Sequence, residues 1–193
     1  MIDKKICAPR GRPRGFCVEQ AVETALELFR QRGYDGVGVA DLTQAIGVAP
    51  PSLYAAFGSK AGLYSRALDL YQEREGRWLL EALESDLPAA ELLKRVIRAA
   101  ATAYAGKKEG CLVCRGELGC SDEAAAAMTA ERRRASRDLM RDRLAAAGAG
   151  DAEALADYAL AALHGLTGAA QDGLGAQRLA EIAAGFAAGI PQS

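Results

Sequence analysis

Alanine constrains the fold of this chain more than any other residue, because it supplies 24 of the 73 residues from Ser121 to Ser193. Alanine has the highest intrinsic helix propensity, and its small side chain lets helices pack closely. Valine, isoleucine and threonine, which favour strands, number only 18 among the 193 residues. Half of the residues are hydrophobic and 25% are charged, which is typical of a globular protein. The sequence therefore predicts an all-α protein and excludes a β-sandwich, a collagen-like chain and a disulfide scaffold.

Glycines and prolines divide the chain into segments with helical periodicity. Gly33 ends the first segment, Pro50 suits the first position of a helix, and Gly58 is a natural helix stop. Ser59 can cap the helix that follows. The expected helices cover approximately residues 18–32, 39–46, 50–57, 60–83, 88–104, 122–147, 152–171 and 176–188, with a short helical segment within 111–118.

Charge is unevenly distributed, although the net charge is only −1. Residues 1–14 form a basic arm in which a single acidic residue, Asp3, accompanies five basic ones. Any nucleic acid should therefore meet the N-terminal end of the chain. We expect three parts: a basic arm over 1–15, a DNA-binding domain over 16–60, and a ligand-binding and dimerisation domain over 61–193. The basic residues of the arm are Lys4, Lys5, Arg10, Arg12 and Arg14.

A short helix, a glycine turn and a second short helix over 39–57 fit a helix-turn-helix that reads DNA. Leu42 and Leu53, with Ile46 and Val48, would hold the two helices at a fixed angle. The exposed face of the second helix would then enter the major groove. The candidate DNA contacts are Pro50, Pro51, Ser52 and Ala55 near the start of that helix, Tyr54 and Lys60 toward phosphates, and Arg12 and Arg14 in an adjacent minor groove.

The same residues carry a family resemblance. Gly-Tyr-Asp-Gly at 33–36, Asp-Leu-Thr-Gln-Ala-Ile-Gly-Val at 41–48 and Ser-Leu-Tyr-Ala-Ala-Phe-Gly-Ser-Lys at 52–60 resemble the DNA-binding domain of TetR/AcrR-type transcriptional repressors. Gly-Arg-Pro-Arg at 11–14 is also similar, and Gly-Cys-Leu-Val at 110–113 resembles a ComR-like branch of that family. The chain differs from the usual pattern in two places. Gly38 stands where the family has Ser or Thr, and Gly62 stands near a common acidic position, so two helix caps should be weakened.

The resemblance implies a homodimer that binds a near-palindromic operator and leaves it when an unknown small-molecule effector binds. Within that family the segment 50–57 would be the recognition helix, Gly47 the turn, and the last two helices the dimer interface. Apolar spacing on these helices supports the interface, because two such faces would leave much apolar surface exposed on a monomer. The expected interface residues are Leu155, Ala159, Ala162, Leu163, Leu166, Gly168, Leu179, Ile182 and Phe186.

Three cysteines suggest an alternative sensor. Cys111, Cys114 and Cys120 could bind a soft metal or form a disulfide, which would make the protein a thiol- or metal-responsive repressor on the same scaffold. Buried cysteines more often act as small hydrophobic residues. His164 is expected to be a hydrogen-bonded interface residue, and the charge run over 131–137 a solvated helix face.

An all-α enzyme or interaction module without a DNA role is the third hypothesis. The chain has no phosphate-binding loop, paired carboxylates or nucleophile–base motif, so we expect no enzyme and no cofactor. Residues 1–14 lack the apolar core of a signal peptide, and the longest uncharged stretch of the helical body, 158–171, is too short and polar to span a bilayer. We therefore expect a cytoplasmic location.

Overall fold

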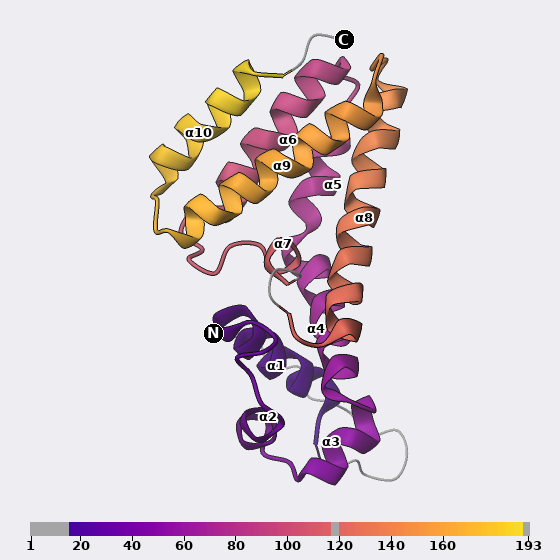
Figure 1. Ribbon diagram of the computed structural model, residues 1–193, viewed down its shortest axis with the longest axis vertical. Helices are drawn as coiled ribbons and strands as arrows, with labels where there is room; N and C mark the ends of the chain where they lie inside the picture. Colours follow the sequence, from indigo (N-terminus) through magenta and orange to yellow (C-terminus); the bar gives the residue numbers. More distant parts are fainter. Residues whose placement is uncertain (1–15, 117–119, 191–193) are drawn as a thin grey trace. The chain divides into compact units, whose positions relative to one another are not determined.

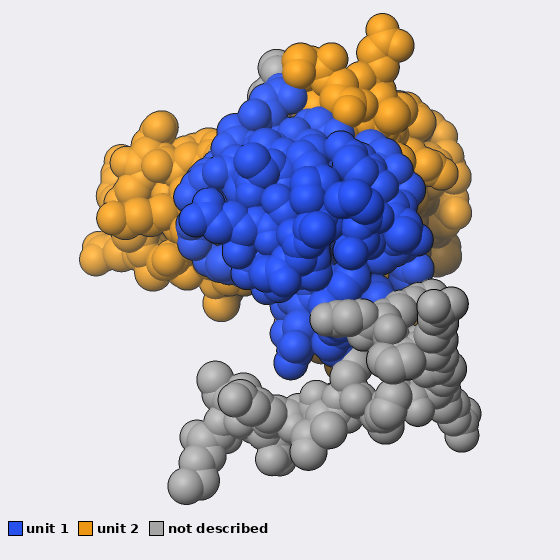
Figure 2. Space-filling view, turned by 90° about the horizontal axis from the view of Figure 1, so that it is seen from below, with its two compact units in different colours: residues 1–70 blue, residues 71–193 orange. Residues whose placement is uncertain are grey.

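The computed structural model describes residues 16–116 and 120–190, which form helices and no strand (Figure 1). The chain divides into two compact units, residues 1–70 and residues 71–193, which are coloured separately in Figure 2. No helix in the described ranges is long and apolar enough to cross a membrane. The all-α prediction is therefore confirmed.

The N-terminal unit contains three helices and the first part of a fourth. A cluster of aromatic rings forms its core: the ring centroid of Phe29 lies 5.9 Å from that of Tyr34 and 4.9 Å from that of Tyr64. Tyr64 lies on the last of these helices, so the cluster joins the first and fourth helices of the unit. The helices are α1 (Val18–Arg32), α2 (Val39–Ile46), α3 (Pro50–Phe57) and α4 (Lys60–Glu75).

Helix α4 is shorter than the sequence predicts. Ser59 caps it as expected, because its hydroxyl accepts a hydrogen bond from the Gly62 backbone N–H at 3.0 Å. The expected helix over 60–83 breaks at Gly76, however, and α5 (Arg77–Leu83) follows. At the break the Leu79 N–H bonds to the Gly76 carbonyl at 3.1 Å, three residues back, so the helix tightens locally. A glycine inside a helical pattern is tolerated at a cost, and here it marks the change of direction.

The C-terminal unit packs its helices around α6 and α9. Helix α6 contacts α5, α8, α9 and α10, and α9 also contacts α7, α8 and α10. The predicted bounds of α9 and α10 match the structure, because a capping side chain or glycine marks each start. The remaining helices are α6 (Ala89–Tyr104), α7 (Leu112–Arg115), α8 (Glu123–Ala146), α9 (Ala152–Gln171) and α10 (Ala176–Ala188).

A close approach of backbone to helix fixes the loop that leads into α7. Gly110 is buried with a φ of 63°, in the left-handed region that L side chains rarely adopt. A Cβ at this position would lie 2.8 Å from the Thr167 Cγ2 atom of α9. Gln171, one turn further along α9, also holds the loop, because its side-chain amide donates to the Glu109 carbonyl at 3.3 Å. Gly110 thereby sets the distance between α7 and α9.

We expect Gly110→Ala to reduce the free energy of unfolding more than Gly173→Ala does. Gly173 has a φ of 83°, but a Cβ added there would have no atom within 4 Å. Alanine at position 173 should therefore cost only backbone strain, about 1–2 kcal/mol of the free energy of unfolding. Alanine at position 110 adds overpacking against Thr167, a further 1–3 kcal/mol or so. Urea denaturation of the two variants and the parent measures the difference. Equal reductions of the free energy of unfolding in the two variants would show that α9 moves to accommodate the methyl group at position 110.

Candidate functional site

The N-terminal unit contains a well-defined helix-turn-helix. Gly47 ends α2 with a φ of 78° and a ψ of 35°, and the backbone N–H groups of Gly47 and Val48 both bond to the Thr43 carbonyl, at 2.9 and 3.0 Å. Leu42 and Leu53 are fully buried and hold α2 against α3, whereas Ile46 and Val48 are half-buried. The turn geometry and the two buried leucines give the pair of helices a fixed angle, as the spacing predicts.

The second helix of this pair presents an exposed face. Tyr54, which the sequence marks for phosphate contact, has 46% of its surface exposed. The helix begins with two prolines, whose missing N–H groups leave no unsatisfied donors in the first turn. This face is uncharged and offers hydroxyl groups and small side chains. Its exposed residues are Pro50, Pro51, Ser52, Tyr54 and Ala55, and Arg12 and Arg14 lie outside the described residues.

The aromatic core sets the position of Lys60. The Lys60 ammonium lies 3.8 Å from the centroid of the Tyr34 ring, in a cation–π contact. Tyr34 itself stacks on Phe29 and contacts Tyr64, with 4.9 Å between the two tyrosine ring centroids. The contact joins residues 26 positions apart, and no local sequence pattern could have revealed it.

The predicted weakness at the start of α2 is offset by another residue. Gly38 has no side chain to cap the helix, but the Asp41 carboxylate accepts a hydrogen bond from the Gly38 N–H at 2.7 Å. The second Asp41 oxygen lies 3.5 Å from the Arg32 guanidinium. This supplies half of a capping box and a charge that favours the helix N-terminus.

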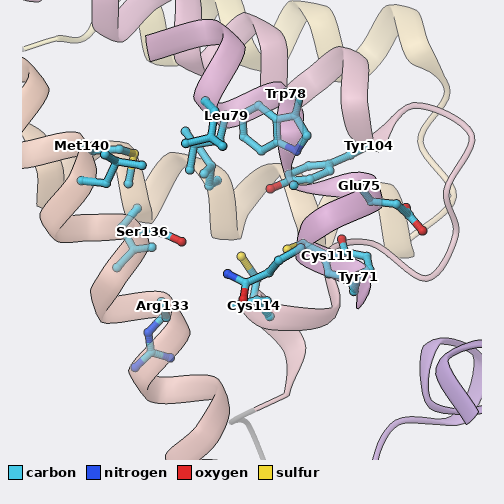
Figure 3. Close-up of a pocket in the computed structure, with 17 residues that line it drawn as sticks. Tyr71, Glu75, Trp78, Leu79, Tyr104, Cys111, Cys114, Arg133, Ser136 and Met140 are labelled. Carbon is cyan, nitrogen blue, oxygen red and sulfur yellow. The ribbon is translucent and has the colours of Figure 1, made fainter. Parts of the chain in front are cut away.

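The C-terminal unit contains a partly open, largely apolar cavity of about 180 Å³ (Figure 3). Residues 71–193 contain only five aromatic residues, and three of them line this cavity. The positions of these few aromatic residues are the sequence signal that could have indicated the cavity. The walls come from the end of α4, from α5, α6 and α7, and from α8 and α9. The lining residues that Figure 3 labels are Tyr71, Glu75, Trp78, Leu79, Tyr104, Cys111, Cys114, Arg133, Ser136 and Met140.

Two of the three candidate thiols meet in this cavity. A hydrogen bond from Cys114 lowers the pKa of Cys111 to about 6, against the opposing effect of burial. The same hydrogen bond, together with burial, raises the pKa of Cys114 well above its ordinary value. Burial and the charge on Cys111 also raise the pKa of Tyr104, so it stays a neutral phenol. The two pKa shifts have opposite directions, so Cys111 is the more acidic thiol of the pair.

The third thiol lies elsewhere. Cys120 does not line the cavity, and its sulfur lies 3.5 Å from the Asp122 carbonyl oxygen. No group of three or more His, Cys, Asp or Glu side chains in the described part of the chain could hold a metal ion. The expected trio of cysteines is thus not brought together.

Arg133 and His164 also differ from their sequence interpretations. Arg133 lines the cavity, so the charge run over 131–137 is not wholly a solvated face. His164 is half-buried, and its Nε2 atom has no hydrogen-bond partner among the described residues. Burial, with a smaller effect of Arg133, lowers the pKa of His164. Both residues therefore belong to the region between α8 and α9 beside the cavity.

Most residues expected at the dimer interface are buried within this chain. The apolar spacing of α9 and α10 is satisfied by α6 and α8, so the same stripe that suggested an interface forms the core of the unit. Gly168, Ile182 and Phe186 stay partly exposed. The expected interface residues that are at most 5% exposed within the chain are Leu155, Ala159, Ala162, Leu163, Leu166 and Leu179.

A different, outward face of α9 is rich in small residues. Ala154, Ala161 and Gly165 are exposed on it, and Tyr158 lies between them with its hydroxyl donating to the Phe186 carbonyl at 2.7 Å. A Cβ at Gly165 would lie 3.2 Å from the Phe186 ring, so α9 and α10 approach closely there. The two helices together form a small-residue surface that another copy of the chain can approach closely.

Comparison with known proteins gives concordant matches. The family model described as "Bacterial regulatory proteins, tetR family" matches residues 21–67. The chain is 38% identical over 186 residues to the HTH-type transcriptional repressor BdcR of Escherichia coli (strain K12), covering 95% of this chain and 94% of that protein. It is 45% identical over 65 residues to the HTH-type transcriptional repressor ComR of the same organism, covering 34% of this chain and 31% of that protein.

One solved structure extends the likeness over most of the fold. It is a cysteine-substituted TetR family transcriptional regulator, CifR, complexed with 26-base-pair double-strand operator DNA. Its TM-score to this chain is 0.82 at 32% identity, with 94% of this chain and all of that chain covered. The similarity therefore includes both compact units and is not confined to the helix-turn-helix.

The thiolate predicts a pH-dependent alkylation. Iodoacetamide reacts with thiolates, so its rate with Cys111 should fall as pH drops below about 6 and level off above it. The same cysteine in urea-unfolded protein should show a midpoint near 8.5 or so. Mass spectrometry of the Cys111 peptide measures both rates, with Cys111→Ser as the blank. A folded-state midpoint equal to the unfolded one would contradict the assignment.

Proposed function

This chain belongs to the TetR family of bacterial regulatory proteins, and from that premise we propose that it is a repressor that binds operator DNA and is released when a small molecule enters the cavity. The observation that carries the proposal is that one unit has a helix-turn-helix with an exposed second helix and the other unit has an apolar cavity. Its relatives are named transcriptional regulators, so we infer no catalytic role. A regulator of this kind works where the chromosome is, in the cytoplasm.

The helix-turn-helix supports an assignment of different residues to bases, to phosphates and to the minor groove. We assign 1–15 to a basic arm, 16–60 to DNA binding and 61–193 to ligand binding and dimerisation. The structure of CifR with operator DNA is the precedent for this use of the N-terminal unit. Side chains near the start of α3 reach base edges, and the cations beside it reach phosphates. The proposed contacts are Pro50, Pro51, Ser52 and Ala55 to bases, Tyr54 and Lys60 to phosphates, and Arg12 and Arg14 to the minor groove.

The outer face of α9 and α10 is the proposed dimer interface. A two-fold interface uses the same surface on both copies, so small residues that permit close approach suit it. The proposed interface therefore omits the buried residues that the sequence suggested. It retains Gly168, Ile182 and Phe186, which are partly exposed. Two recognition helices related by a two-fold axis read a near-palindromic operator. The exposed residues added to the interface are Ala154, Tyr158, Ala161 and Gly165.

Helix α4 connects the two activities. It begins at Lys60, a proposed phosphate contact, and ends at Glu75, which lines the cavity. A ligand that favours one position of the Glu75 end shifts the equilibrium between two positions of the same helix. Reciprocity then requires that operator DNA weaken ligand binding by the same factor.

We expect Lys60→Met to weaken binding to every duplex and to reduce the slope of log K against log salt by about one. Methionine keeps the apolar contact with the Tyr34 ring but removes the charge, so the unfolding temperature should change little. Lys108→Met, in an exposed loop of the C-terminal unit, is the matched control and should bind like the parent. Fluorescence anisotropy with a sequence selected from a random duplex pool measures both. Parental affinity and slope in Lys60→Met would refute the phosphate contact.

We expect Ala161→Asp to convert the dimer to a monomer and to abolish operator binding, because the new charge would be buried without a partner at the interface. Ala161 is exposed within the chain, so the fold should survive. Ala135→Asp, on an exposed position of α8, should stay dimeric. Light scattering and thermal unfolding of both variants are the measurements. A dimeric Ala161→Asp protein that still binds operator would place the interface elsewhere.

A further inference from the structure

The cavity in the C-terminal unit also points to the class of molecule that fills it. Resting on the proposed function, we propose that the effector is a small uncharged molecule, mostly apolar and about the size of a substituted benzene, that carries one hydrogen-bond donor. Size, wall chemistry, the state of one hydroxyl and the placement of charge each support a separate part of this description.

Size sets the first limit. The cavity holds about 180 Å³. An apolar cavity of roughly 150 Å³ engineered in another protein accepts benzene, whereas pockets for drug-sized ligands span roughly 300–1,000 Å³. The ligand should therefore contain a single ring or a branched chain of similar bulk, with a short substituent.

The walls favour an apolar body with a flat face. Trp78 and Tyr104 meet edge to face, with 5.8 Å between ring centroids, and both line the cavity. Leu79 and Met140 lie across from these rings in Figure 3. Aromatic pairs prefer offset or edge-to-face contacts, so a third ring fits beside this pair without rearrangement.

The state of Ser136 determines the polar group of the ligand. Its hydroxyl donates to the Arg132 carbonyl one turn back on α8, at 3.0 Å, so its proton is already used. The oxygen keeps a lone pair toward the cavity, and in Figure 3 it faces the thiols of Cys111 and Cys114 from the opposite wall. A serine in this state accepts hydrogen bonds and does not donate them. The complementary ligand group is a donor, such as an alcohol.

Charge placement argues against an ionised ligand. The Glu75 carboxylate accepts a hydrogen bond from Lys107 at 2.9 Å, so its charge is balanced within the protein. Arg133 is half-exposed, and in Figure 3 its guanidinium lies beyond Ser136, away from Trp78 and Tyr104. Cys111 and Cys114 also line the cavity, and an ionised thiol there would repel a bound carboxylate. An ion placed among the aromatic rings would lose hydration without a counter-charge.

Trp78 provides a direct readout, because it is the only tryptophan in the chain. We would titrate the full-length protein with benzyl alcohol, toluene and benzoate and follow Trp78 fluorescence, with calorimetry as a second measurement. Benzyl alcohol should bind tightest, toluene roughly 3- to 10-fold more weakly for the lost hydrogen bond, and benzoate weakest. Tighter binding of benzoate would make Arg133 an anion receptor and overturn the proposal, as would equal binding of toluene and benzyl alcohol.

Two variants of Ser136 separate the polar contact from the cavity itself. Ser136→Ala should bind toluene as the parent does and lose the preference for benzyl alcohol. Ser136→Leu should fill the cavity and bind neither, whereas Ala135→Leu, on an exposed position of the same helix, should bind both. A preference for benzyl alcohol that persists in Ser136→Ala would contradict the acceptor role.

Operator binding, measured separately from ligand binding, distinguishes a failure of the proposed ligand class from a failure of the proposed repressor function. If the protein selects an operator from a random duplex pool but binds none of the three probes, the ligand class is wrong and the repressor function stands. If it binds benzyl alcohol but selects no DNA, the proposed function fails and the cavity assignment stands. Release of the operator by benzyl alcohol, with no release by benzoate, is the result we expect.

Discussion

The unbroken backbone hydrogen bonding of α4 is the constraint on which the two activities depend. A helix whose hydrogen-bond ladder is unbroken curves only gently, because sharp kinks need a break in that ladder. Ser59 fixes where α4 begins, and Gly76 fixes where it ends. Between these points α4 contributes Tyr64 to the aromatic core and places Lys60 just after the recognition helix. Tyr71 and Glu75, near the other end of the helix, line the cavity. This continuity is the basis of the proposed coupling between ligand binding and DNA binding.

Local features of the sequence predicted most of the helices, whereas features that depend on distant residues were missed. Helices α2, α3, α9 and α10 have the expected bounds because glycine, proline and capping residues act within one turn of the helix. The sequence does not predict the break at Gly76, because an isolated glycine is compatible both with a continuous helix and with a helix break. The Lys60–Tyr34 contact and the cavity arise from tertiary packing. The apolar stripe of α9 showed that a face is buried but not what covers it.

Two of the three candidate thiols lie together in the structure, and the third lies apart. Cys111 and Cys114 both line the cavity, as their spacing predicts, and the hydrogen bond between them shifts their pKa values in opposite directions. Cys120 contacts the backbone of Asp122 and takes no part. Without a third thiol the pair gives a metal no closed coordination shell. The pair instead contributes polar atoms to the wall of the cavity.

The stacking of Lys60 on Tyr34 has a consequence for the entropy of DNA binding. A free lysine side chain has about 2 kcal/mol of rotamer entropy to lose when it is fixed in a complex. Lys60 is already held over a ring that the core keeps in place, so much of this ordering occurs when the protein folds. Its ammonium is therefore preorganised for an anion, and in the proposed complex with DNA Lys60 supplies a cation whose conformational freedom has already been lost.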